Sequence, residues 1–314
     1  MNKKFVPKKI KTELKKYISN YTQTYAKEIS RNIALKGEQI ISSGLKDYLQ
    51  MFKAALGGGF IVAFACLFKM ELSAVDTSLL NKAIFYSLNY SMAFIMIYIF
   101  HFALATKQPA MTAATLAANI DSDLQKDDHF EHLSLLVAKI WRTQFIAFVG
   151  NVLMAFPVAL ALVAGLSWLT GENEATYKAA KLIGDLDIFT SLAIPHAAIA
   201  GVFLFISGMI AGSISNKLKV KQISARIIHH PLLKQMISLK TRTKIGNYID
   251  HYWAGIVSNF WFGVFMGSIS IIGIIIGINL DIRHITFAAG NFALGLYGYG
   301  FEITTLQLVH SIIG

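Results

Sequence analysis

Long blocks of apolar residues recur along the 314-residue chain, separated by shorter polar segments. A helix that crosses the hydrocarbon core of a bilayer needs about 20 mostly apolar residues. A membrane β-barrel would need apolar and polar residues to alternate, and these blocks do not alternate. The pattern predicts an all-α fold, a polytopic transmembrane helical bundle of about six spans at 54–68, 83–105, 145–169, 188–214, 253–278 and 285–309.

The N-terminal segment has a different pattern, in which apolar residues recur every three or four positions among many lysines. This spacing places them on one face of a helix. The stripe consists of Ile10, Leu14, Ile18, Tyr21, Tyr25 and Ile29. We therefore divide the chain into a basic amphipathic helical segment at 1–50 and a transmembrane helical domain at 51–314. The amphipathic helix would lie on a membrane surface or pack on a partner.

Charge is scarce and unevenly distributed. Only 15% of the residues are charged and 54% are hydrophobic, yet the formal net charge is +11. With these spans, 24 of the 29 Lys and Arg residues fall on the side that holds 1–53, 106–144 and 215–252. The positive-inside rule makes this side cytoplasmic. We therefore expect a multi-pass membrane protein with both termini in the cytoplasm and anionic lipid headgroups at its basic loops.

Polar residues inside spans are costly unless they have partners, so they are the first candidates for function. Four spans contain an asparagine followed four positions later by a small residue, which puts both on one helix face. Close helix packing with an interhelical hydrogen bond would explain the pattern, and so would a polar path through the bundle. The four asparagines are Asn89, Asn151, Asn259 and Asn291.

Two further segments carry candidate polar residues. His101 ends the second span, and Lys107 and Gln108 precede a proline that opens a short apolar helix at 110–120, either re-entrant or an ordinary buried connector. Between the last two spans, Asp281, Arg283 and His284 lie in a turn expected at the outer membrane edge. There Asp281 would cap the next helix and Arg283 would pair with Asp281 or a lipid phosphate, unless the turn is only a polar helix connection.

Sequence signatures of cofactor and metal sites are absent. The chain has no phosphate-binding Walker loop, no dinucleotide fingerprint and no HExxH motif, and its single cysteine, Cys66, excludes a CxxC pair. The mixed run Asp127, Asp128, His129, Glu131 and His132 lacks a metal-ligand spacing and is interpreted as a solvated helix start. We therefore expect no cofactor, no metal and no recognisable catalytic set.

Several stretches resemble a bacterial inner-membrane family described as site-specific recombinases. They include LATKQPAMTAATLA (104–117), SNFWFGVFMG (258–267) and NLDIRHITFAAGNFALGL (279–296), and the resemblance covers about residues 37 to 300. Its members are usually longer, which implies a short member or a fragment. The family label implies DNA recombination. Against this, Arg283 and His284 are expected away from cytoplasmic DNA, and loops of roughly 38 residues are too short for a catalytic domain.

Three functions remain open. The first is transport or binding of a solute, ion or lipid at a polar intramembrane site. The second is a membrane scaffold or envelope-maintenance protein that docks a partner through its basic loops. The third, from the family label alone, is DNA recombination. The expected partners are membrane lipids, and a homo-oligomer is left open, whereas DNA is not expected.

Overall fold

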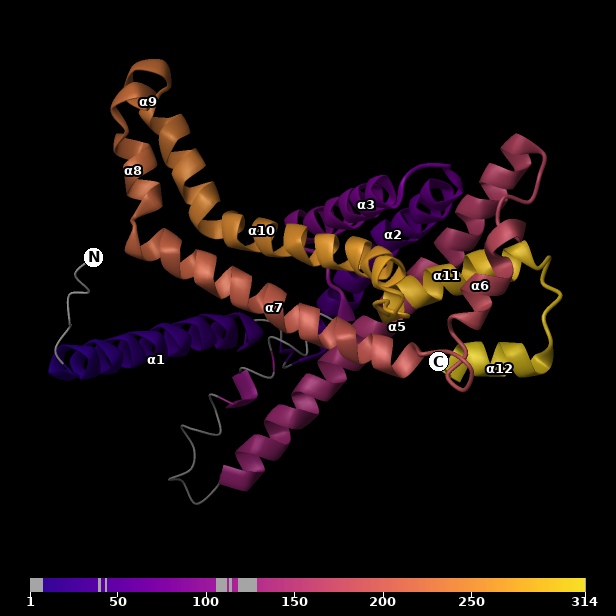
Figure 1. The fold of residues 1–314 in the computed structure, drawn as a ribbon, viewed down its shortest axis with the longest axis horizontal. Coiled ribbons are helices and arrows are strands. Elements are labelled where there is room, and N and C mark those ends of the chain that lie inside the picture. Colours follow the sequence, from indigo (N-terminus) through magenta and orange to yellow (C-terminus); the bar gives the residue numbers. More distant parts are fainter. Residues whose placement is uncertain are drawn as a thin grey trace, which may run out of the picture.

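The structure is a computed structural model that describes residues 8–38, 41–42, 44–105, 112, 115–117 and 129–313. All the regular elements among these residues are helical (Figure 1). Five of the helices are long and apolar enough to cross a membrane: α2 (Leu45–Ala74), α3 (Leu79–Ile99), α5 (His129–Thr170), α7 (Ala193–Val220) and α10 (Leu239–Ile276). The prediction of a polytopic transmembrane helical bundle is confirmed.

The outer surface of these helices is apolar, as a lipid environment requires. Large side chains such as Leu88, Met92 and Phe205 are exposed on α3 and α7. Water would oppose this exposure, whereas lipid tails are as apolar as the side chains themselves. The chain is therefore a multi-pass helical membrane protein.

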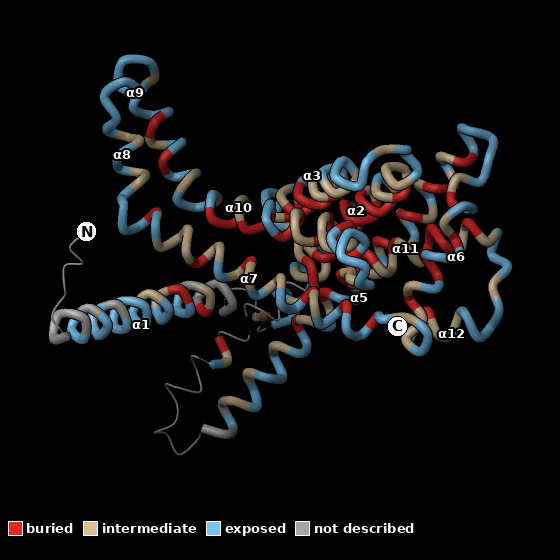
Figure 2. Tube along the Cα trace, viewed as in Figure 1, coloured by how far each residue is buried: buried red, intermediate tan, exposed pale blue. Residues whose placement is uncertain are grey.

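Small residues let the helices of the bundle pack closely in two pairs, α2 with α5 and α3 with α10. A Cβ at Gly59 would overlap the backbone of Asn151 in α5, and a Cβ at Gly263 would overlap the backbone of Ser91 in α3. Close approach of this kind favours van der Waals packing, which drives helix association in lipid. Figure 2 shows that the buried residues gather where these pairs meet.

The chain re-enters the bundle after α10. Gly277 adopts a left-handed conformation with φ +73° and ends the helix, and residues 279–284 follow without regular structure. The next helix, α11 (Ile285–Gly298), starts inside the bundle, where Phe287 packs against Tyr90 and Phe94. Phe94 lies beyond the midpoint of α3, so 279–284 run back to about half the depth of that helix. We call 279–284 the re-entrant segment.

The last expected span, 285–309, is not one helix in the structure. α11 has 14 residues, too few to cross a bilayer alone, and it ends before Gly300 and Phe301, whose φ angles are +60° and +66°. A separate helix, α12 (Thr305–Ile313), follows. It packs against α6 (Ala179–Gly184), which follows a 3-10 helix, η2 (Thr176–Lys178). The C-terminal helix lies at the opposite end of the bundle from the N-terminal helix (Figure 1).

Several helices project from the other end of the bundle. The second half of α7, the short α8 (Ile223–His229) and α9 (Pro231–Met236), and the start of α10 form a mostly exposed arm (Figure 2). The N-terminal helix, α1 (Lys8–Glu38), packs along α7, with Ile29 against Gly212 and the hydroxyls of Tyr25 and Ser213 2.8 Å apart. The apolar stripe thus faces α7 at Tyr25 and Ile29.

Candidate functional site

Asn151 is the most completely hydrogen-bonded of the four candidate asparagines. Its Nδ2 donates to the carbonyl oxygens of Ala55 (2.7 Å) and Ala103 (2.9 Å). Its Oδ1 accepts from the backbone N–H of Ala105 (2.9 Å) and the hydroxyl of Thr286 (3.2 Å). The side chain is fully buried. All donors and acceptors of the amide are engaged, so this residue fits the packing interpretation and leaves no group for a ligand.

The other three asparagines differ in their partners. Asn89 donates to the carbonyl of Ala65 and so joins α3 to α2, and Asn259 donates within its own helix to the carbonyl of Gly255. Asn291, on α11, is half-buried, and its amide forms no hydrogen bond with any residue that the structure describes. Asn291 is therefore the one of these four whose amide forms no hydrogen bond within the described residues.

His101 has a local structural role. It has a left-handed φ of 56° just after α3, and its ring Nε2 lies 3.3 Å from the hydroxyl of Tyr252 on α10. Lys107 and Gln108 lie outside the described residues, as does most of the expected helix at 110–120. Its described residues contact neighbouring helices: Thr115 donates to the carbonyl of Ala34, and Gln144 donates to the hydroxyl of Thr112.

The re-entrant segment brings ionic groups into the bundle. The guanidinium of Arg283 lies 3.1 Å from Asp185 and 3.2 Å from Asp281, and all three side chains are largely buried. The backbone N–H of Arg283 donates to the carbonyl of His196, whose ring Nε2 lies 3.1 Å from the carbonyl of Asn279. Of the two partners expected for Arg283, Asp281 and a lipid phosphate, the structure shows Asp281 and adds Asp185.

His284 is 1% exposed and packs against the rings of Phe94 and Phe287, so it lies inside the bundle. One expectation about this segment was wrong. Asp281 does not cap α11, because its Oδ1 accepts from the adjacent N–H of Ile282, and His284 occupies the N-cap position. The sequence pattern did not show that the chain folds back at this turn.

A cluster of lysines that sequence reasoning missed lies beside the re-entrant segment. Lys69 on α2 lies over the rings of Tyr90 (5.1 Å) and Tyr86 (5.7 Å) on α3. Lys178, on η2, donates to the hydroxyl of Ser73 one helical turn after Lys69. The ammonium of Lys82 lies 3.5 Å from the carbonyl of Ser73. A signal was present: the side with few charges holds only five Lys and Arg residues, namely Lys69, Lys82, Lys178, Lys181 and Arg283.

Burial has the largest effect on the pKa of Lys178. Desolvation, with the positive charges of Lys69, Lys181 and Lys82, lowers the pKa of Lys178 to about 8, and Asp185 opposes the shift only in part. Asp281 is close enough to Lys69 to attract it. The lysine cluster and the re-entrant segment thus form one continuous polar region at the end of the bundle opposite the arm.

A second ionic contact holds α12 at this end. The ring Nδ1 of His310 lies 3.0 Å from Oδ2 of Asp187, and the ring of Phe189 packs against the imidazole at 4.7 Å. Asp187 also accepts the backbone N–H groups of Phe189 and Thr190. These hydrogen bonds, with that of His310 the largest, lower the pKa of Asp187 to about 2.

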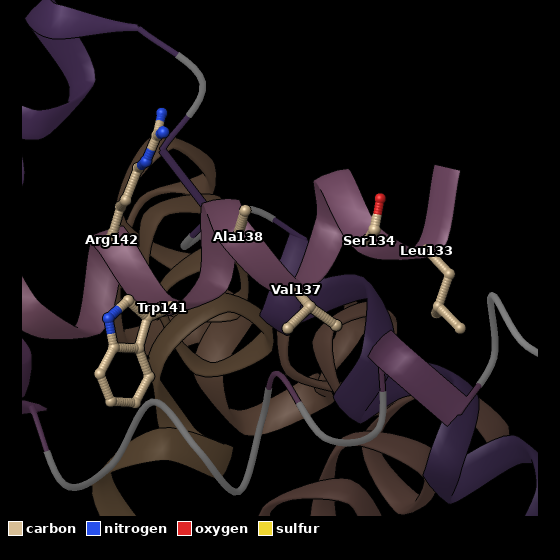
Figure 3. A pocket seen from close by; sticks show the side chains of 6 residues that line it. All are labelled: Leu133, Ser134, Val137, Ala138, Trp141 and Arg142. Atoms are coloured by element: carbon tan, nitrogen blue, oxygen red, sulfur yellow. The ribbon is translucent and has the colours of Figure 1, made fainter. Parts of the chain in front are cut away.

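A groove of about 560 Å³ lies elsewhere, along the first half of α5. Figure 3 shows that the side chains lining it all come from this one helix. They are Leu133, Ser134, Val137, Ala138, Trp141 and Arg142. Because a single, mostly apolar helix face lines it, the groove is an open surface and not an enclosed ligand site. No group of three metal-binding side chains occurs among the residues described.

Comparison with known proteins supports the family resemblance. A family model described as site-specific recombinase matches residues 3–314. No curated protein and no solved structure matches the chain.

Proposed function

The chain belongs to the site-specific recombinase family, and we propose that this multi-pass membrane protein binds or transports a small solute, ion or lipid at the re-entrant segment, residues 279–284. The observation that carries the proposal is a stretch of irregular backbone inside a helical bundle that holds the charged side chains of Asp281 and Arg283. Irregular backbone at membrane depth is tolerated where it is buried in protein or lines a cavity, and interrupted helices form the binding sites of many transporters.

Unsatisfied polar atoms around this segment support a binding role. Nδ1 of His196 and Nε of Arg283 are buried without a hydrogen-bond partner among the described residues. Asn291, on the helix that follows the segment, is half-buried and forms no hydrogen bond within the described residues. Buried polar groups are nearly always satisfied, so the atoms of His196 and Arg283 point to a water molecule or a ligand as the missing partner.

We further propose a bacterial inner membrane with the arm, α1 and the N-terminus in the cytoplasm. The uneven distribution of Lys and Arg supports this orientation. The α12 end would then face the periplasm, because α12 binds the 185–190 region at the end opposite the arm. Anionic lipid headgroups are the proposed partners of the basic arm.

Thiol accessibility tests whether a polar path reaches the site. In a Cys66→Ala background, Asn291→Cys should react with a membrane-impermeant maleimide in vesicles, because its side chain is half-buried and unbonded. The native thiol of Cys66, which is 2% exposed, serves as the unreactive control, and Leu306→Cys, at a position 65% exposed on α12, as the reactive one. If Asn291→Cys stays as unreactive as Cys66, the bundle is dry at this point and the proposal fails.

A scaffold or envelope-maintenance function is the second candidate, and the projecting arm favours it. Lys217 and Lys221 are exposed near the end of α7 and Lys219 lies between them, where a partner of opposite charge has access. If the arm docks a partner, reversing these three charges should abolish function in cells, while Asn291→Ala should have no effect. The opposite pattern would favour the intramembrane site.

DNA recombination is the activity that the family description names. The residues Arg283 and His284 offer a duplex no accessible surface, because the first is paired with two aspartates and the second is buried. Non-specific attraction to basic surfaces weakens steeply with salt. Retention of a specific duplex by the purified protein at elevated salt would therefore support recombination over the membrane-site proposal.

A further inference from the structure

Three lysines from three separate elements converge near Ser73 at the α12 end of the bundle. Lys178 donates to the hydroxyl of Ser73, and Lys82 lies 3.5 Å from its carbonyl oxygen. Lys69 lies one turn earlier on α2, so it shares a helix face with Ser73. All three side chains are half-buried. Like charges repel, and isolated lysines near a membrane surface would extend apart into water, so their convergence requires an explanation.

Acidic side chains do not provide that explanation. No ion pair to Lys69, Lys82 or Lys178 forms within the part of the chain that the structure describes. Asp281, which attracts Lys69, and Asp185, which attracts Lys178, are both paired with Arg283. The positive charge of the cluster is therefore left without a direct counter-ion.

Neutral groups hold the lysines in place and leave donors free. The rings of Tyr86 and Tyr90 face the ammonium of Lys69, and Ser73 accepts from Lys178. The hydroxyl of Tyr177 donates to the carbonyl of Met70 at 2.6 Å and fixes η2 against α2. Each ammonium has three N–H donors, so the cluster keeps several for an acceptor with multiple oxygens.

We propose that Lys69, Lys82 and Lys178 bind a phosphate group. Lysine ammonium groups bind phosphate as point charges, and three of them would match the charge and the several oxygens of this anion. The group could belong to a phospholipid headgroup or to inorganic phosphate, because the chemistry of recognition is the same. This inference rests on the proposed function, since it names the ligand class for the polar region beside the re-entrant segment.

The test uses the full chain in phosphatidylcholine nanodiscs at neutral pH. In one arm, inorganic phosphate is titrated against chloride at equal ionic strength, and thermal unfolding is measured. In the other, phosphatidylglycerol replaces part of the phosphatidylcholine. Stabilisation by inorganic phosphate identifies a soluble phosphate site, and stabilisation by phosphatidylglycerol alone identifies a headgroup site.

Matched variants localise the effect. Lys82→Gln/Lys178→Gln should weaken the response at least about tenfold, since each charged hydrogen bond contributes about a factor of ten. Lys178→Arg should retain it. Lys240→Gln/Lys244→Gln, which removes the same charge from exposed positions on the arm, should respond to inorganic phosphate like the wild type. Circular dichroism checks that each variant is folded.

Two outcomes would overturn the inference: stabilisation of the wild type by neither phosphate source, or an equal response of the Lys82→Gln/Lys178→Gln variant. Failure here is distinct from failure of the proposed function. If Asn291→Cys reacts with the impermeant maleimide but neither phosphate source stabilises the protein, a polar site exists and its ligand is not a phosphate.

Discussion

The amide of Asn151 joins α2, α5, α11 and the chain after α3 through its four hydrogen bonds. Asn151→Ala leaves the N–H of Ala105 and the hydroxyl of Thr286 without an acceptor in a buried place. Each such loss costs about 1–3 kcal/mol, so we expect the free energy of unfolding to fall by about 3 kcal/mol. Reversible unfolding in detergent measures it, with Asn89→Ala, which removes one bond and should cost about 1 kcal/mol, as the control. Equal losses in both variants would contradict this account.

The sequence predicted the asparagine pattern but not which amide is saturated. The small residue four positions on does lie at a helix contact in three cases: Ala155 is close to Gly59, Gly263 to Ser91 and Gly295 to Ile183. Helix periodicity alone gives this result. The bonds of Asn151, however, reach residues as far away in the chain as Thr286, and periodicity carries no information about such partners.

Lys178 should destabilise the protein when no anion is present. Burial and the positive charges of Lys69, Lys181 and Lys82 lower its pKa to about 8. The negative charge of Asp185 opposes this shift. The unfolded chain, where the ordinary pKa of 10.5 applies, binds more protons than the folded one between about pH 8 and 10.5. Stability contributed through Lys178 therefore rises with pH across this window.

We accordingly expect Lys178→Gln to raise the melting temperature at pH 7 in a neutral detergent without phosphate. The advantage should shrink as the pH rises from about 8 towards 10.5, because the wild-type lysine then loses its charge. Melting curves of both proteins across this range measure it. A variant less stable than the wild type at pH 7, or a difference independent of pH, would contradict the charge repulsion described.

Among the elements, α12 forms one ionic contact with the described part of the bundle, that of His310 with Asp187. The hydrogen bonds that hold the pKa of Asp187 at about 2, against the ordinary 3.8, stabilise the carboxylate in the folded state. This contribution is complete above about pH 4 and is lost as the pH falls through about 2. We expect Asp187→Asn to release α12 already at neutral pH and to accelerate hydrogen exchange at 305–313. Asp76→Asn, an exposed aspartate, is the control, and unchanged exchange in Asp187→Asn would show that apolar contacts hold α12.

The elements that the sequence predicted best are those set by hydropathy alone. The first five expected spans fall within α2, α3, α5, α7 and α10, except that the second and fifth extend past α3 and α10 and the fourth begins before α7. The sixth expected span is not a single helix, because the apolar residues continue through 285–309 whereas the helical conformation of the backbone ends at Gly298. Gly300 and Phe301, both with positive φ, break the helix, and hydropathy does not register conformation.

At the scale of the whole molecule, the sequence pointed to the re-entrant segment of the candidate site but not to the lysine cluster beside it. The motif around Asp281, Arg283 and His284 was singled out because charged residues are rare near spans. Lys69, Lys82 and Lys178 were counted only as loop charges that set orientation. They come from parts of the chain separated by up to about a hundred residues, and only the folded bundle brings them together. A count of charges predicts on which side of the membrane a loop lies, but it does not predict that these three lysines come together.

The number of crossings decides where the two ends of the molecule lie. With five spanning helices, and with α11 returning to the end where 279–284 entered, we expect the termini on opposite sides of the bilayer, whereas six spans would place them together. We expect a reporter fused after α12 to be active only outside the cytoplasm. A tag before α1, and a tag inserted at the α8–α9 turn as an internal control, should be accessible only after the membrane is permeabilised. A C-terminal reporter on the same side as both tags would show that 285–313 cross the membrane, and would remove the re-entrant segment on which the proposed site depends.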